Sequence, residues 1–388
     1  MRKRGLYSLS IPALALSLTF NYCTRMNIEW SELPQLPPPA PGIKQPGVAG
    51  PFAGIHGTTL IIAGGANFRD TMPWHGGKKY YHDDIYALNL PVNGSSWKSC
   101  RGEISLPVPV AYGASASTEA GLVCMGGETE LGLTDAAYII SGAGEKLIIT
   151  PLPPLPVPLS NAASASLGPK VYIAGGLTPE GSSYALWCLD TEEIPAGWQR
   201  LADMPLPLVN SVMAATSGGD PELWMLGGRT RGADDDMSLI RSEVISYSVN
   251  DDRWHSRGEL ADGNGVIRLA AGTGAAIDER YIAIFGGNDG EVYNRVEKIL
   301  SAMPRETDTA LLAEMRREYT GLQESHPGFS RTVIIYDTET AKSLIAGEIP
   351  GPAQVTTPAV STPFGIIIPS GEIRPGVRTE VIRMANFR

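Results

Sequence analysis

The chain has 388 residues, and glycine (44) and proline (31) together form an unusually large share of them. Hydrophobic residues make up 43%, which suffices for a large core and excludes wholesale disorder. The formal charge of −10 argues against a general nucleic-acid binder, and four cysteines are too few for a disulfide scaffold. The CxxC, HExxH, P-loop and GxSxG signatures of common zinc, nucleotide and serine-hydrolase sites do not occur in the sequence.

The N-terminus has the pattern of a secretory signal. Arg2, Lys3 and Arg4 precede residues 6–20, which carry no charge and are rich in Leu and Ala. This apolar run is shorter than the roughly 20 residues of a membrane span. We therefore expect residues 1–23 to be a signal peptide and the protein to be exported to a periplasm, the alternative being a buried N-terminal helix. No membrane span is expected.

Cys23 lies near the expected cleavage point, which leaves a lipoprotein signal and a lipid anchor open. Asn21 and Tyr22 speak against it, because such signals prefer small residues before the cysteine. The sequence does not pair the other three cysteines, Cys100, Cys124 and Cys188.

An apolar run that ends in two glycines recurs along the chain with a period near 50 residues. Five clear copies and a degenerate sixth end at Gly64-Gly65, Gly126-Gly127, Gly175-Gly176, Gly227-Gly228, Gly286-Gly287 and Ser370-Gly371. The pattern resembles kelch repeats, each of which forms one blade of a β-propeller. It predicts an all-β fold, a six-bladed propeller that spans residues 27–388 as one domain.

Other strands of each blade follow the glycine pairs, and Trp97, Trp198 and Trp254 mark a further strand in three blades. The last blade runs out after Met384. The segment around Trp30 resembles the missing strand, so we expect the N-terminal strand to close the ring and remove its exposed edges.

The long spacing between the fifth and sixth copies predicts one helical insertion, at about residues 291–329 in blade five. Val292, Val296, Ile299 and Leu300 fall on one helical face. A second helix, with Asp308 as its cap, carries apolar residues at Leu311, Leu312, Met315 and Tyr319. The two helices are expected to form a wall or lid beside the mouth of the propeller, or otherwise a surface decoration.

The residue that follows each glycine pair is expected to point toward one mouth near the propeller axis. These residues are Ala66, Glu128, Leu177, Arg229, Asn288 and Glu372. Two carboxylates, an arginine and an amide that converge on one pit favour a small polar ligand, although polar residues are common on any loop face. The acidic run Asp234 to Asp236 is expected to be a solvated turn rather than a cation site.

Specific segments resemble the exported kelch-type N-acetylneuraminate mutarotases of bacteria, also called N-acetylneuraminate epimerases. These segments are GVAGPFAGI (47–55), IIAGGA (61–66), GKKYYH (77–82), GGET (126–129) and SGEIRPGVRT (370–379). The resemblance covers all six blades and the helical insertion. In ordinary members the block with the Pro-Gly-x-Arg-Thr pattern precedes the Gly-Val-Ala-Gly block, whereas here it follows it. The chain therefore looks like a cyclically permuted branch, which a closed ring of blades tolerates.

The resemblance implies that Glu372 accepts a proton and that Arg378 is its functional partner. An arginine suits the carboxylate of sialic acid, and a positioned carboxylate can act as the base that interconverts the anomers. A loop salt bridge between the two is the alternative. Glu128 and His82 match family positions as supporting or substrate-binding residues, and Asn67, Arg69, Arg229 and Asn288 are substrate-binding candidates by position.

The resemblance therefore implies an exported isomerase, a mutarotase that interconverts the α and β anomers of N-acetylneuraminate by acid–base ring opening, with no metal or organic cofactor required. Two alternatives remain, a non-enzymatic propeller that binds glycans or proteins and a mutarotase for another acidic sugar. The oligomeric state, including a homodimer, is left open by the sequence.

Overall fold

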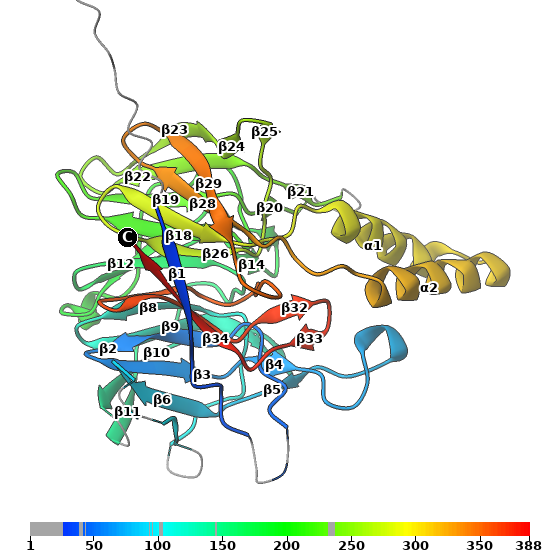
Figure 1. The fold of residues 1–388 in the computed structure, drawn as a ribbon, viewed down its shortest axis with the longest axis horizontal. Helices are drawn as coiled ribbons and strands as arrows, with labels where there is room; N and C mark the ends of the chain where they lie inside the picture. The colour runs from blue at the N-terminus through cyan, green and yellow to red at the C-terminus, as the bar shows by residue number, and fades with distance from the viewer. Residues whose placement is uncertain are drawn as a thin grey trace, which may run out of the picture.

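Six four-stranded antiparallel sheets surround one axis and form a β-propeller (Figure 1). The computed structural model describes residues 26–38, 42, 44–92, 94, 96–100, 104–143, 146–231 and 237–388. The expected signal peptide, Cys23 and the acidic run at Asp234 lie outside the described residues. The prediction of a six-bladed, all-β propeller is confirmed.

The strands of each blade follow one another from the axis outward. Blade one contains β2 (Phe52–His56), β3 (Thr59–Ala63), β6 (Ile85–Asn89) and β7 (Lys98–Ser99), and blade two β8 (Ala114–Thr118), β9 (Gly121–Thr129), β10 (Gly132–Ala143) and β11 (Lys146–Pro151). Blade three contains β12 (Ala163–Leu167), β13 (Lys170–Ala174), β16 (Leu186–Asp190) and β17 (Gln199–Arg200), and blade four β18 (Val212–Thr216), β19 (Glu222–Leu226), β22 (Glu243–Ser248) and β23 (Arg253–Glu259). Blade five contains β26 (Thr273–Ala276), β27 (Tyr281–Phe285), β28 (Thr332–Asp337) and β29 (Lys342–Glu348), and blade six β30 (Val360–Thr362), β31 (Gly365–Pro369), β34 (Ile382–Phe387) and β1 (Ile28–Leu33).

The connections between the second and third strands extend beyond the blades. Four of them form short hairpins, namely β4 (Ala66–Asn67) with β5 (Tyr80–Tyr81), β14 (Leu177–Thr178) with β15 (Gly181–Ser182), β20 (Arg229–Thr230) with β21 (Leu239–Ile240), and β32 (Glu372–Arg374) with β33 (Val377–Arg378). Blade five instead inserts α1 (Glu291–Ala302), η3 (Met303–Arg305) and α2 (Thr309–Glu324). The remaining elements are η1 (Pro73–His75), η2 (Ile194–Ala196) and the hairpin of β24 (Ala261–Asp262) with β25 (Gly265–Val266).

The N-terminal strand closes the ring, as the sequence predicts. Strand β1 pairs antiparallel with β34, and Trp30 lies opposite Ala385. The Trp30 ring also packs edge-on against Phe285 of blade five, with 5.8 Å between the ring centroids. The first and the last described strands thus meet in blade six, and each of the six blades has four strands.

The tryptophans of the outer strands connect neighbouring blades. The indole N–H of Trp97 donates to the Pro34 carbonyl at 2.6 Å, that of Trp198 to Pro153 at 2.9 Å and that of Trp254 to Ala202 at 2.8 Å. Each acceptor follows the outer strand of the preceding blade. The repeated tryptophan therefore supplies apolar area and one hydrogen bond at the blade interface.

A ring of six hydrogen bonds ties the blades together at the axis. Each blade contributes one residue just before its inner strand, and its N–H donates to the carbonyl of the equivalent residue in the preceding blade at 2.7–3.0 Å. All six residues have left-handed backbones with φ between 54° and 62°. They are Gly50, Tyr112, Asn161, Asn210, Ala271 and Thr356.

The glycine pairs allow one blade to approach the backbone of the next. A Cβ on Gly175, whose φ is +68°, would lie 2.1 Å from the Leu208 carbonyl oxygen of the following blade. The N–H of Gly176 donates to the same oxygen at 2.8 Å. In the degenerate copy Ser370 also has a positive φ, and its buried hydroxyl hydrogen-bonds to the backbone of Val48. The pairs therefore serve the contact between blades.

The apolar core is divided into six clusters, each shared by adjoining blades. Cys100, Cys124 and Cys188 are buried in it. A cavity of about 430 Å³ follows the axis, lined by the inner strands with mostly Ala, Ser, Gly and Thr. Small side chains are needed here because six strands converge.

The helices occupy the predicted insertion and project from the propeller (Figure 1). Asp308 caps α2, accepting a hydrogen bond from the Ala310 N–H at 2.8 Å. Ile299 is buried, but Leu300 and Leu311 are 43% and 44% exposed, so the apolar faces are covered only in part. In the described part of the chain, no helix has the length and apolar character needed to cross a membrane.

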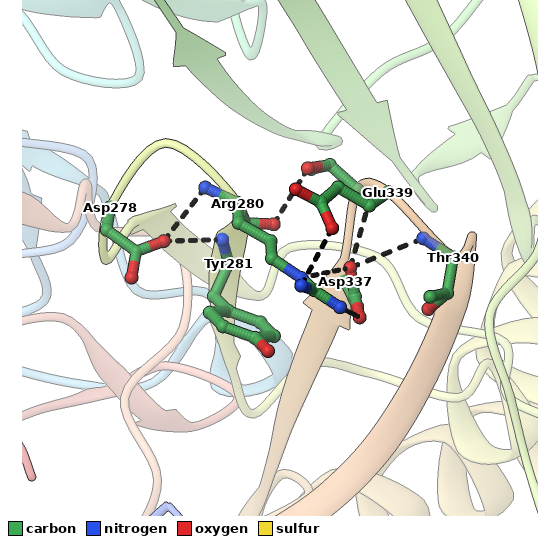
Figure 2. A network of polar contacts seen from close by, with 7 residues as sticks. Asp278, Arg280, Tyr281, Asp337, Glu339 and Thr340 are labelled. Atoms are coloured by element: carbon green, nitrogen blue, oxygen red, sulfur yellow. Dashed lines mark hydrogen bonds and ion pairs between the residues drawn. The ribbon is translucent and has the colours of Figure 1, made fainter. Parts of the chain in front are cut away.

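An ion-pair cluster in blade five stabilises the two turns at the ends of its strands (Figure 2). Arg280 binds both carboxylate oxygens of Asp337, at 2.9 and 2.6 Å, and also pairs with Glu339. Asp278 accepts the N–H groups of Arg280 and Tyr281 at 2.8 Å. The hydrogen bond and charge of Asp337 raise the pKa of Arg280. Because these turns lie at the end of the blade away from the glycine pairs, the cluster belongs to the scaffold.

Substitutions at Ala271 test the cost of the left-handed ring. Ala271→Gly should leave the free energy of unfolding unchanged or raise it by up to about 1 kcal/mol, because relief of the φ strain is offset by a freer unfolded chain. Ala271→Val should destabilise by about 1–3 kcal/mol, since a β-branched residue is strongly disfavoured at positive φ. Urea unfolding of both variants measures this.

The matched control is Ala276, which lies in β26 of the same blade. In a strand the order should reverse, with the valine variant more stable than the glycine variant. An Ala271→Val protein as stable as the wild type would contradict the importance of the ring geometry.

Candidate active site

The six residues that follow the glycine pairs occupy equivalent positions around the axis. Each forms an isolated β-bridge with the residue that precedes the ring residue of its own blade, and the bridges are Ala49–Ala66, Ala111–Glu128, Ser160–Leu177, Val209–Arg229, Ala270–Asn288 and Val355–Glu372. From the ring of left-handed residues, the inner strands extend along the axial cavity. The six bridged residues therefore surround the axis at the opposite end of the ring, and we call this end of the propeller the mouth.

Glu372 and Arg378 face each other across the β32–β33 hairpin. They are register partners, and Arg378 Nη1 lies 2.7 Å from Glu372 Oε1. The turn between them contains Gly376, whose φ is +74° and whose N–H donates to the same oxygen at 2.8 Å. The Glu-x-x-Pro-Gly-x-Arg spacing thus forms a tight hairpin that aligns one carboxylate with one guanidinium.

Arg378 is enclosed by residues from three blades. Its Nη2 donates to the Tyr112 hydroxyl at 3.3 Å, its Nε to the Ala66 carbonyl at 3.4 Å, and its guanidinium lies 5.2 Å from the Phe68 ring centroid. Burial disfavours its charge, but Glu372 and Tyr112 outweigh burial and raise the pKa of Arg378. The Arg378 side chain is only 4% exposed, whereas Glu372 is 18% exposed. The carboxylate is therefore the more accessible member of the pair.

A second ion pair joins blades one and two. Lys79 Nζ lies 3.1 Å from Glu128 Oε1, and the Tyr81 hydroxyl donates to the same oxygen at 2.5 Å. Burial and this hydrogen bond raise the pKa of Tyr81, so Tyr81 keeps its proton. Glu128, one of the residues expected at the mouth, is thus held by two donors.

Tyr112 connects the two ion pairs. Its hydroxyl accepts from Arg378, and Lys79 Nζ lies 4.8 Å from the centroid of its ring. Tyr112 is itself a ring residue with a φ of +59°. The sequence does not single it out, but it lies two residues after Val110, at the position that Gly50 holds in blade one. Alignment of the blades on the residues before each inner strand could have found it.

The other candidates from blade one have mixed environments. Asn67 is 2% exposed and its amide donates to the Gly47 carbonyl at 2.9 Å, so it supports the hairpin from inside. Arg69 is exposed and lies over the Tyr80 ring at 5.0 Å. His82 Nδ1 lies 3.5 Å from Arg69 Nη2 and 3.9 Å from Asp84 Oδ2. Within the described residues, Asn67 and Arg69 form no hydrogen bond or ion pair with Glu372 or Arg378.

Arg229 and Asn288 hold the mouth positions of blades four and five. Arg229 donates to Asn210 at 3.3 Å and to Ser238 at 3.1 Å, and its guanidinium lies 5.5 Å from the Tyr293 ring of α1. Asn288 accepts the N–H of Gly290 at 2.8 Å and so shapes the turn into α1. Both connect the blades to the helical insertion.

His326, which sequence reasoning missed, lies at the end of the insertion. It is 8% exposed, and its Nδ1 accepts the N–H of Gly328 at 3.1 Å. Burial lowers the pKa of His326, although the charge of Glu372 acts in the opposite direction. The histidine is therefore neutral at pH 7 and lies within the electrostatic range of the hairpin.

The insertion also reaches the hairpin through a loop of blade one. His75 Nε2 lies 2.9 Å from Glu324 Oε1 at the end of α2. In the same loop, Met72 and Trp74 lie so close to Gly376 that a Cβ there would be 3.0 and 3.3 Å from them. The turn between Glu372 and Arg378 is thus backed by packed side chains.

Tyr112 also lines the axial cavity, whereas the charged residues Glu372, Arg378, Lys79 and Glu128 do not. Across the described ranges, we find no group of three or more His, Cys, Asp or Glu side chains arranged to hold a metal ion.

Comparisons with known proteins place the chain in a family. The sequence model of N-acetylneuraminate epimerase matches residues 17–149 and 152–388. Similar curated proteins are N-acetylneuraminate epimerases. Those of Brucella suis (strain ATCC 23445 / NCTC 10510), Haemophilus influenzae (strain PittEE) and Yersinia pestis (strain Pestoides F) are 37%, 34% and 35% identical over 108, 136 and 132 residues. These segments cover 26%, 32% and 31% of this chain and 26%, 34% and 32% of the respective relatives. With the family match extending over all six blades, the chain belongs to the N-acetylneuraminate epimerase family.

Proposed function

We propose that the protein is an exported mutarotase that interconverts the α and β anomers of N-acetylneuraminate. The observation that carries the proposal is the Glu372–Arg378 pair, in which a partly exposed carboxylate at the mouth is fixed by a buried guanidinium. The family membership and the names of the relatives support the substrate class.

The proposed reaction needs one base and a path for one proton. The Glu372 carboxylate takes the proton of the anomeric hydroxyl, the bond between the anomeric carbon and the ring oxygen breaks, and the ring oxygen receives a proton. The protonated Glu372 can supply it, so no net proton is consumed. The open-chain keto acid turns its carbonyl and the ring closes on the other face by the reverse steps.

Arg378 has two tasks in this proposal. Its Nη1, together with the N–H of Gly376, fixes the Glu372 carboxylate that acts as the base. Its Nη2 makes only a 3.3 Å contact with Tyr112, so an oxygen of the substrate carboxylate can replace that hydroxyl. A charge-assisted bond is stronger than the neutral one it replaces.

Glu372→Gln keeps the size and most hydrogen bonds but removes the base. We expect the rate of mutarotation to fall by about 10²–10⁴-fold with little change in binding. Proton NMR of freshly released α-N-acetylneuraminate, with and without protein, measures the rate. Glu348→Gln is the control, because Glu348 is 64% exposed and pairs with Arg331 on the outer strand of blade five. Wild-type activity in Glu372→Gln would refute the catalytic assignment and favour a binding propeller.

Arg378→Ala should weaken binding of the anionic substrate, raising KM by about 10-fold or more because a charge-assisted hydrogen bond is lost. A carboxamide analogue should be much less affected. Arg378→Lys keeps the charge but not the planar fork, so an intermediate KM is expected. Thermal unfolding of each variant separates this effect from a loss of folded protein. Equal losses for the acid and the carboxamide would contradict the anchor role.

Export is proposed from Arg2 to Arg4 and the uncharged residues 6–20. Cell fractionation and N-terminal mass analysis should find a chain cleaved near residue 23 outside the cytoplasm. If Cys23 carries a lipid anchor, palmitate labelling should be lost in Cys23→Ala. An uncleaved, full-length chain in the cytoplasm would contradict export.

A further inference from the structure

The two cations that contact Tyr112 differ sharply in accessibility. Arg378 is 4% exposed and has a partner at each of its three nitrogens. Lys79 is 31% exposed and approaches the Tyr112 ring at 4.8 Å and the Tyr81 ring at 5.6 Å. A ligand anion that enters the mouth therefore meets Lys79 more readily than Arg378.

Lys79 is held in place without being enclosed. Glu128 accepts from its ammonium at 3.1 Å, and the ammonium lies 5.6 and 4.8 Å from the centroids of the Tyr81 and Tyr112 rings. Glu128 is itself fixed by the Tyr81 hydroxyl. An ammonium group has three N–H donors, and one bond to Glu128 leaves donors for a ligand.

Tyr112 contacts both Arg378 and Lys79 and so links the two cations into one candidate anion-binding site. Its hydroxyl accepts from Arg378 and its ring lies against Lys79, so both charges border the same side chain. The hydroxyl proton has no acceptor in the described part of the chain, and it can be donated to a carboxylate. Two cations and one hydroxyl that meet at the same tyrosine offer the kinds of donor that bind a carboxylate.

We propose that Lys79 is a substrate-binding residue that, with Arg378 and Tyr112, forms a two-cation site for the carboxylate next to the anomeric carbon. This inference rests on the proposed function and extends it to a residue of another blade. Glu128 is then a positioning residue, which keeps the ammonium of Lys79 beside Tyr112. The arrangement also brings the anomeric carbon close to Glu372, because Glu372 and Tyr112 share the guanidinium of Arg378.

Other basic residues near the mouth fit this role less well. Arg69 is exposed and lies over Tyr80. Arg374 is exposed within the hairpin that carries Glu372. Neither arginine contacts Tyr112 within the described residues, whereas Lys79 is partly exposed and lies close to the Tyr112 ring.

The test compares Lys79→Met with Lys78→Met. Lys79→Met removes the charge but keeps an unbranched apolar side chain, and Lys78→Met removes a charge from the exposed neighbouring residue. For N-acetylneuraminate we expect Lys79→Met to raise KM by about 10–100-fold, with kcat changed far less, because a charged hydrogen bond to the ground state is lost. Lys78→Met should stay within about threefold of the wild type, as expected for an exposed and screened charge. Lys79→Arg should recover most of the lost affinity.

A carboxamide analogue provides the readout that a merely structural role would not change. Its KM or dissociation constant should differ little between the wild type and Lys79→Met. Equal effects of the Lys78 and Lys79 substitutions, or equal losses for the acid and the carboxamide, would overturn the proposal.

Binding measured separately by NMR titration distinguishes failure of this inference from failure of the proposed function. If the wild type binds N-acetylneuraminate in a Lys79-dependent way without accelerating mutarotation, the carboxylate site stands and the proposed activity is wrong. If the wild type neither binds nor converts the sugar, both are wrong.

Discussion

The ring of six left-handed residues around the axis is the constraint on which the mouth depends. Each N–H in the ring binds the preceding blade, so six separate sheets share one closed hydrogen-bond circuit. In each blade, the residue before the ring residue forms a β-bridge with the residue after the glycine pair. This bridge fixes the mouth residue of the blade next to the ring. Five of the six ring residues are not glycine. The left-handed strain at each of them is offset by contacts between blades that no single blade could make.

Closure of the ring also explains why the site can be formed from opposite ends of the chain. Glu372 and Arg378 lie near the C-terminus and Lys79 near the N-terminus, yet blades six and one are neighbours because β1 completes blade six. Arg378 binds the Ala66 carbonyl of blade one and Tyr112 of blade two directly. The site depends on the cyclic order of the blades and not on where the chain begins. A permuted order of sequence blocks therefore leaves these contacts possible.

Features that repeat from blade to blade can be predicted from the sequence, whereas contacts that occur only once in the propeller cannot. Glycine pairs and tryptophans recur because each blade must meet the next in the same way, and these signals locate the six blades, the closing strand at Trp30 and the position of Glu372. Tyr112, Lys79 and His326 come from three different connections, and their proximity follows only from the way the blades adjoin. Similarly, the repeat predicts Arg229 and Asn288 at the mouth, but their contacts with α1 and its preceding turn depend on an insertion without repeat partners.

That insertion changes the environment of the hairpin more than its partly exposed helices suggest. Its C-terminal segment carries buried His326, whose pKa is affected by the charge of Glu372. Glu324 at the end of α2 pairs with His75, and the loop that contains His75 packs Met72 and Trp74 against Gly376. The His75–Glu324 pair is about half exposed and contributes little by itself. The packing on Gly376 matters more, because the N–H of this glycine binds the same Glu372 oxygen that Arg378 binds. A shift of the turn would loosen both bonds to that oxygen at once. The helices of blade five are thus coupled to the carboxylate of blade six through a loop of blade one.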